Sequence, residues 1–114
     1  MASHPERLSP QARETCESGN LVLSVASVWE IAIKCQTGRL KLPGEPRDYI
    51  LTQVRAAGIT LLPIQYRHAM TAAALPPVNK DPFDRMLAAQ CIEEGMPCVS
   101  RDEALSAYGV RVLW

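Results

Sequence analysis

Short apolar runs alternate along the chain with segments in which apolar residues recur every three or four positions. The runs at 21–25, 59–64, 96–99 and 110–114 are rich in Val, Ile and Leu, which is typical of buried strands. Helical spacing, with Gly or Pro at the boundaries, predicts helices over 9–19, 27–38, 49–57, 66–74, 81–95 and 102–108. Strands that alternate with helices in this way indicate an α/β fold with a mostly parallel sheet.

Two of these helices begin with clear capping signals. Ser27 is expected to cap the second helix, and Asp81 the fifth, with Pro82 in the first helical position. Such caps satisfy backbone N–H groups that have no partner within the helix. One face of the fifth helix collects residues that are mostly apolar, namely Phe83, Met86, Leu87, Gln90 and Cys91.

Length and composition are those of one small domain. The 114 residues suffice for a single core, so residues 1–114 are expected to form one domain. Only 5% of the residues are aromatic, so the core must rest on aliphatic side chains. No apolar run approaches the roughly 20 residues that span a bilayer, and no signal-peptide pattern opens the chain. We therefore expect a cytoplasmic protein with no membrane contact.

Cysteine spacing and net charge bear on two further properties, zinc binding and attraction to nucleic acid. The four cysteines form no C-x-x-C pair, and both histidines, His4 and His68, lie far from them in sequence, which disfavours a zinc site. The chain has 12 basic and 12 acidic residues, so no overall field attracts nucleic acid. This balance neither supports nor excludes an RNA substrate.

Acidic residues stand at three predicted strand-to-helix junctions. Glu30 follows the first run, Asp81 and Asp84 open the fifth helix, and Asp102 follows the run at 96–99. In open parallel sheets, ligands bind outside the carboxyl ends of the strands, so these side chains are expected to share one crevice. A few carboxylates suffice to bind Mg²⁺ or Mn²⁺, and such a cation would support phosphodiester hydrolysis.

Each of these carboxylates also has a purely structural explanation. Ser27 and Glu30 fit a capping box, in which the glutamate reaches back to the N-cap amide. Asp81 and Asp84 suit a helix start through the helix dipole, and Asp102 could cap the last helix. Capping is the commoner role for any one of them, whereas three acids at three junctions make the two explanations comparable.

Other polar residues near these acids also have two explanations each. Arg85 would either hold a phosphate beside the metal or pair with a nearby acid. Lys34 is better explained as an i, i+4 partner of Glu30. Ser100 would either donate a hydrogen bond to a ligand carboxylate or simply end a strand. Arg85 and Ser100 join Asp81 as auxiliary candidates for the site.

At these residues the chain resembles the PIN-domain family, and in particular its VapC-type toxins from bacterial toxin–antitoxin pairs. The resemblance covers nearly the whole chain, in the family's order and spacing. It rests on residues 24–34 (SVASVWEIAIK), 38–40 (GRL), 62–64 (LPI), 81–90 (DPFDRMLAAQ), 99–102 and 110–114. The SVASVWEIAIK and DPFDRMLAAQ segments together form a specific pair of signatures.

The resemblance implies a Mg²⁺-dependent endoribonuclease with a flavodoxin-like sheet, and Mn²⁺ is the alternative to Mg²⁺. It assigns Glu30, Asp84 and Asp102 to an acidic metal site, with Asp81 as an auxiliary acid or a helix cap. In-line hydrolysis of an RNA phosphodiester is the expected reaction. The resemblance also implies a homodimer and tight inhibition by a cognate antitoxin.

The chain departs from the family at its N-terminus. Family members begin with a central apolar strand that ends in an aspartate, the first metal ligand, and residues 1–20 contain no counterpart. Without that strand, unpaired backbone groups would favour poor stability, segment swapping or aggregation. We therefore expect either that Met1 is internal and the native protein starts roughly 15 to 20 residues upstream, or that the chain is a genuine truncation.

Three functions remain open at this level. The first is an RNA-cleaving toxin, and the second is a catalytically impaired PIN-domain remnant that binds antitoxin without cleaving RNA. The third is a small partner-binding module whose acids are helix caps. Dependence on a divalent ion separates the first function from the other two, and antitoxin binding separates the second from the third.

Overall fold

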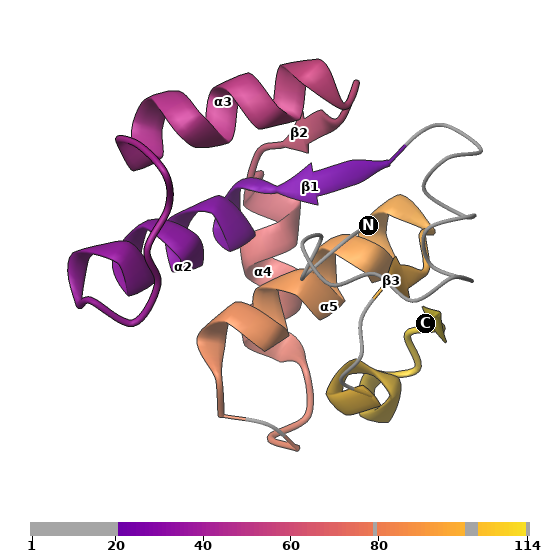
Figure 1. The fold of residues 1–114 in the computed structure, drawn as a ribbon. Helices are drawn as coiled ribbons and strands as arrows, with labels where there is room; N and C mark the ends of the chain where they lie inside the picture. Colours follow the sequence, from indigo (N-terminus) through magenta and orange to yellow (C-terminus); the bar gives the residue numbers. More distant parts are fainter. Residues whose placement is uncertain (1–20, 79, 100–102, 114) are drawn as a thin grey trace.

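The computed structural model describes residues 21–78, 80–99 and 103–113 (Figure 1). The helix expected over 9–19 therefore lies outside the described residues. None of the helices in the described ranges is long and apolar enough to cross a membrane. The elements, in chain order, are β1 (Val22–Ser24), α2 (Val25–Gln36), α3 (Pro46–Ala56), β2 (Thr60–Leu62), α4 (Tyr66–Ala74), α5 (Pro82–Glu94), β3 (Cys98–Val99), the 3₁₀ helix η2 (Glu103–Tyr108) and β4 (Val112–Leu113).

The strands form two parallel pairs. β1 pairs with β2, with Leu23 opposite Leu61. β3 pairs with β4, with Cys98 opposite Val112. No strand among the described residues joins the two pairs. The parallel pairing and the alternation of strands with helices confirm the predicted α/β class.

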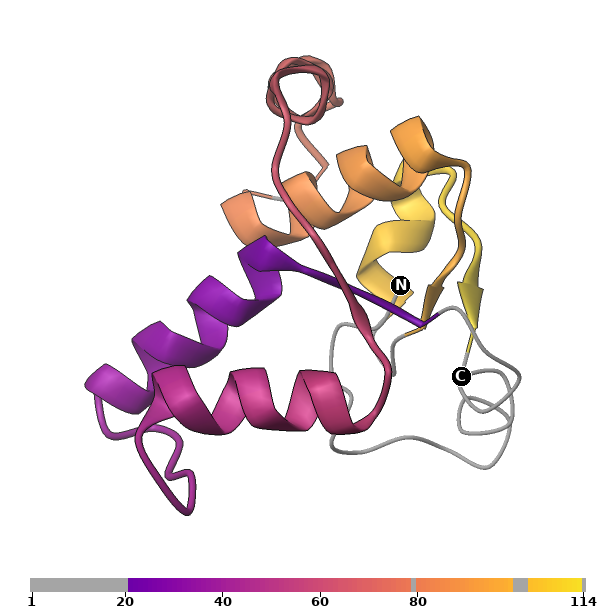
Figure 2. The ribbon, with the colours of Figure 1, turned by 90° about the horizontal axis from the view of Figure 1, so that it is seen from above.

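Helices lie on both sides of β1. In both views this strand runs between α3 and α5 (Figures 1 and 2). The contact between α4 and α5 is the most extensive in the fold, and α2 contacts both α3 and α5. The helices that carry Glu30 and Asp84 are therefore direct neighbours.

The main core lies under the second half of α5. Leu87 and Cys91 on this helix are buried together with Cys98 of β3. Ala88 and Ala89 are fully buried, and their small side chains let neighbouring elements approach the helix closely. Further apolar residues complete this core, namely Leu62, Leu75, Met96, Leu105, Tyr108, Val110 and Val112.

The N-cap of α2 lies three residues earlier in the sequence than predicted. Ser24 has an extended backbone (φ −68°, ψ 140°), and its Oγ accepts a hydrogen bond from Ala26 N at 3.0 Å. Ser24 is thus both the last residue of β1 and the N-cap of α2, so the strand passes into the helix without a loop. The prediction that Ser27 caps this helix is wrong, and Glu30 lies in the second helical turn rather than the first.

The helix α5 begins and ends as the sequence predicts. Asp81 Oδ1 accepts a hydrogen bond from Phe83 N at 2.9 Å, and Pro82 takes the first helical position. The helix ends at Gly95, whose left-handed backbone (φ 65°, ψ 36°) lets Met96 N donate to Cys91 O at 2.9 Å. Both ends rest on contacts within a few residues, which is why local sequence suffices to locate them.

Candidate metal centre

Glu30 and Asp84 lie on two helices that touch each other. Asp84 is in the first turn of α5, where unpaired N–H groups favour negative charge. Glu30 is in the second turn of α2, and both side chains are half-buried. The rings of the preceding residues, Trp29 and Phe83, form an edge-to-face contact with their centroids 5.2 Å apart. The structure therefore brings together the two helical segments that carry these carboxylates.

The capping explanation does not hold for Glu30. Its position inside α2 is too far from Ser24 for a capping box. Within the described residues, its carboxylate makes no hydrogen bond or ion pair, so the expected pairing with Lys34 is not formed. A half-buried carboxylate inside a helix, with no capping role, is the kind of group that functional sites use.

Asp81, in contrast, is a helix cap. Its exposed side chain accepts the hydrogen bond from Phe83 N that closes the first turn of α5. This confirms one of the two roles that the sequence allowed for Asp81. Of the two acids in the DPFD segment, Asp84 is therefore the better candidate for binding a cation.

Arg85 contacts the end of α4. Its Nη1 donates to Pro76 O at 2.9 Å. Its Nη2 donates to Ala72 O and Leu75 O, each at 2.8 Å. These carbonyls lie at the C-terminus of α4, where the helix dipole favours a cation. The bonds favour a structural role for Arg85, which joins α5 to α4, over the predicted contact with a phosphate.

Two predicted site residues, Asp102 and Ser100, lie outside the described residues. They fall between Val99, which ends β3, and Glu103, which begins η2. Across 21–78, 80–99 and 103–113, no three His, Cys, Asp or Glu side chains are close enough together to hold a metal ion. The described candidates are therefore Glu30 and Asp84, and the part of Asp102 stays a prediction.

The chemistry of Glu30 and Asp84 fits a hard divalent cation. Mg²⁺ prefers oxygen ligands, keeps several waters, and is commonly held through one or two carboxylates. Softer transition metals are usually held by imidazole or thiolate ligands instead. The pair Glu30 and Asp84 is therefore suited to Mg²⁺ or Mn²⁺.

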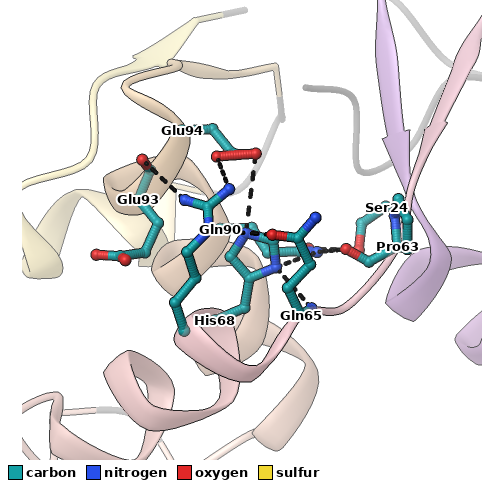
Figure 3. A network of polar contacts seen from close by, with 8 residues as sticks. Ser24, Pro63, Gln65, His68, Gln90, Glu93 and Glu94 are labelled. Atoms are coloured by element: carbon teal, nitrogen blue, oxygen red, sulfur yellow. Dashed lines mark hydrogen bonds and ion pairs between the residues drawn. The ribbon is translucent and has the colours of Figure 1, made fainter.

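A polar network of largely buried residues lies between the start of α2 and the middle of α5, and residue spacing did not predict it (Figure 3). Ser24 Oγ donates to Gln90 Oε1 at 2.5 Å. Gln90 Nε2 donates to Pro63 O at 3.4 Å and lies 3.5 Å from His68 Nδ1. Ser24, His68 and Gln90 are each 0% exposed. The signal in the sequence was Gln90 itself, a polar residue at the centre of an otherwise apolar helix face.

The network continues from His68 to the surface. Gln65 N donates to His68 Nδ1 at 3.0 Å, which leaves the proton of a neutral ring on Nε2. That Nε2 lies 3.9 Å from Glu94 Oε1, and Glu94 Oε2 pairs with Arg67 at 2.6 Å. His68 Nε2 has no hydrogen-bond partner among the described residues, and the ion pair between Arg67 and Glu94 joins α4 to α5 beside it.

The thiols of Cys91 and Cys98 adjoin in the core, and both are reduced. A hydrogen bond with Cys98, together with burial, raises the pKa of the Cys91 thiol far above its ordinary value of 9.0. A buried thiol of this kind is unreactive. Both cysteines therefore serve as part of the apolar core.

Comparison with known proteins identifies the family. The PIN domain family matches residues 3–110. FitAcB from Neisseria gonorrhoeae is 19% identical, with a TM-score of 0.66 over 100% of this chain and 97% of the other. FitAB bound to the IR36 DNA fragment is 21% identical, with a TM-score of 0.63 over 99% and 94%. No curated protein matches the sequence significantly. Since the family match spans most of the sequence, the chain belongs to the PIN domain family.

Proposed function

We propose that this protein is a metal-dependent endoribonuclease toxin of a toxin–antitoxin pair. PIN domains are generally nucleases and typically use divalent metal ions. The observation that carries the proposal is the contact between Trp29 and Phe83, because it joins the segments that bear Glu30 and Asp84. The shared fold with FitAcB and FitAB supports the same assignment.

In this proposal Glu30 and Asp84 hold the cation, Mg²⁺ or Mn²⁺, and Asp102 is the third ligand. When bound, such a cation neutralises charge on the phosphate and lowers the pKa of a nearby water. The chain itself orients the two carboxylates. The N-terminus of α5 stabilises the negative charge of Asp84, and the rings of Trp29 and Phe83 keep the two helices in contact.

Cleavage of a mixed RNA pool tests this function, with Mg²⁺ compared against EDTA. Asp84→Asn should abolish cleavage with little loss of folding, because the side chain keeps its shape. Asp81→Asn is the matched control, since it removes the same charge from the same helical turn and asparagine still caps a helix. We expect Asp81→Asn to cleave like the wild type and Glu30→Gln to be inactive.

The contradicting results are equally definite. RNA cleavage that survives in Asp84→Asn would remove this residue from the site. Cleavage that persists in EDTA would exclude a divalent ion from the reaction. A well-folded wild-type chain that never cleaves RNA would favour the alternative, a PIN domain that binds antitoxin without catalysis.

The proposed partners are a cognate antitoxin and a second copy of the chain. Large apolar side chains that lie exposed on α2 and α4, among them Trp29, Tyr66 and Met70, support a protein partner. Light scattering of the purified chain should give the mass of a dimer, and a monomer at all concentrations would contradict the homodimer. RNA cleavage should fall when the cognate antitoxin is added in equimolar amount.

A further inference from the structure

The side-chain amide of Gln90 joins three parts of the fold at one buried point (Figure 3). Its Oε1 accepts from Ser24 at the end of β1, and its Nε2 faces Pro63 O after β2 and His68 Nδ1 on α4. If the amide were turned by 180°, Oε1 would face Pro63 O and His68 Nδ1. Both are acceptors here, because a carbonyl oxygen cannot donate and Nδ1 already accepts from Gln65 N. The orientation of the amide is therefore determined by its surroundings.

Ser24 is constrained just as closely. Its hydroxyl donates to Gln90 and accepts from Ala26 N. One side chain therefore caps α2 and also ties the start of that helix to the middle of α5. Hydrogen-bonded polar groups in a core favour a single arrangement, whereas apolar contacts tolerate several.

The two candidate metal ligands lie at matched positions relative to this hydrogen bond. Glu30 comes six residues after Ser24, and Asp84 comes six residues before Gln90. α2 and α5 run in opposite directions past each other (Figures 1 and 2). Moving forward along α2 from Ser24 and backward along α5 from Gln90 therefore leads in the same direction in space. Six helical residues span about 9 Å. The Ser24–Gln90 bond therefore determines one end of the α2–α5 interface, and the candidate ligands lie toward the other.

We propose that Gln90 is a positioning residue for the metal site. Through Ser24 it sets how α2 lies against α5, and thereby the placement of Glu30 relative to Asp84. The metal part of this inference rests on the proposed function, but the placement of the helices can be measured without any metal. Partners that hydrogen-bond a metal ligand directly commonly change metal affinity by about 10- to 100-fold when they are removed, and Gln90, which acts through Ser24, is expected at the lower end of this range.

The chain offers a convenient probe, because Phe83 is its only phenylalanine. Replacing it with para-fluorophenylalanine gives one fluorine NMR signal, located at the contact with Trp29 and next to Asp84. Without metal, the chemical shift of this signal reports how α2 lies against α5. With Mn²⁺, paramagnetic broadening of the same signal reports binding at the neighbouring carboxylates.

Three variants are compared with the wild type. Gln90→Leu removes both ends of the amide at similar volume. Ser24→Ala removes the same bond from the other partner, which keeps the test valid if the leucine variant folds poorly. Cys91→Ala is the control, because Cys91 is equally buried on α5 but contacts Cys98 and the core.

We expect the fluorine signal to shift or split in Gln90→Leu and Ser24→Ala, and their Mn²⁺ affinity to fall by about 10-fold. Cys91→Ala should keep the wild-type signal and affinity even at a comparable loss of thermal stability. A wild-type signal and wild-type affinity in both network variants would overturn the proposal, as would an equal change in Cys91→Ala. If Mn²⁺ leaves the wild-type signal sharp, the metal site itself is disproved. The fluorine chemical shift measured without metal then decides alone whether Gln90 sets how α2 lies against α5.

Discussion

The indole of Trp29 meets the ring of Phe83 edge-on, with an angle of 65° between the ring planes and 5.2 Å between their centroids. Trp29 is 61% exposed, so this contact lies at the outer side of the α2–α5 interface rather than in the core. Glu30 and Asp84 directly follow the two aromatic residues in sequence. The contact therefore links two candidate ligands that are 54 positions apart in sequence.

This ring contact should contribute measurably to stability. Aromatic pairs in such geometry contribute about 0.5–1.5 kcal/mol beyond the area they bury. We expect Trp29→Ala and Phe83→Ala to show a coupling energy of about 1 kcal/mol in a double-mutant cycle measured by urea unfolding. Effects that simply add would show that the two rings are neighbours without a favourable interaction.

Substitution of two nearby serines should separate the true helix cap from the predicted one. Ser24→Ala should lower the free energy of unfolding by about 1–3 kcal/mol, because it removes the cap and leaves Gln90 Oε1 unpaired in the core. Ser27→Ala should leave stability unchanged or raise it slightly. Ser27 Oγ is buried, and no hydrogen-bond partner for it exists among the described residues. Chemical denaturation measures the free energy of unfolding of both variants. A larger loss of stability in Ser27→Ala than in Ser24→Ala would show that Ser27 is the cap.

Arg85→Lys should destabilise the protein although the charge is kept. The guanidinium donates to three carbonyls at the end of α4, and a lysine amine on a flexible stem does not reproduce that fork. We expect the free energy of unfolding to fall by about 1–2 kcal/mol. The same change at the exposed Arg47 on α3 serves as the control and should have no effect. Equal urea midpoints for the two variants would show that these bonds contribute little.

The Cys91 thiol should make stability depend on alkaline pH. Its hydrogen bond with Cys98 and its burial raise the pKa in the folded state above the ordinary value of 9.0. At pH values above 9.0 the unfolded chain therefore loses this proton while the folded chain keeps it, so stability falls as pH rises. Below that pH the contribution is fully present.

The size of this pH dependence follows from the single proton that the Cys91 thiol carries. The free energy of unfolding should fall by up to about 1.4 kcal/mol per pH unit more steeply in the wild type than in Cys91→Ala. Apart from the neighbouring Cys98 thiol, the other alkaline-titrating groups are common to both proteins and cancel in the comparison. Parallel stability curves between pH 8 and about 10.5 would contradict the assignment.

Local sequence determined those parts of the fold whose causes lie within a few residues. The signals at Asp81, Pro82 and Gly95 located both ends of α5, because a cap needs only its own helical turn. The order of strands and helices, and their parallel pairing, also followed from periodicity. The positions of Glu30 and Asp84 after predicted strands led to the expectation that they share one crevice, and the helices that carry them are neighbours.

Tertiary structure decided the roles of those polar side chains whose partners are distant in sequence. Ser27 and Ser24 are equivalent as local capping signals, and the choice of Ser24 follows from its hydrogen bond to Gln90, which is 66 positions away. The sequence left Arg85 open between a phosphate contact and an ion pair, and only the structure placed the carbonyls of α4 beside it. The sequence by itself thus determined the elements and the candidate acids. Packing between distant segments decided caps, partners and burial, because the free energy of a polar group depends on neighbours that sequence spacing does not reveal.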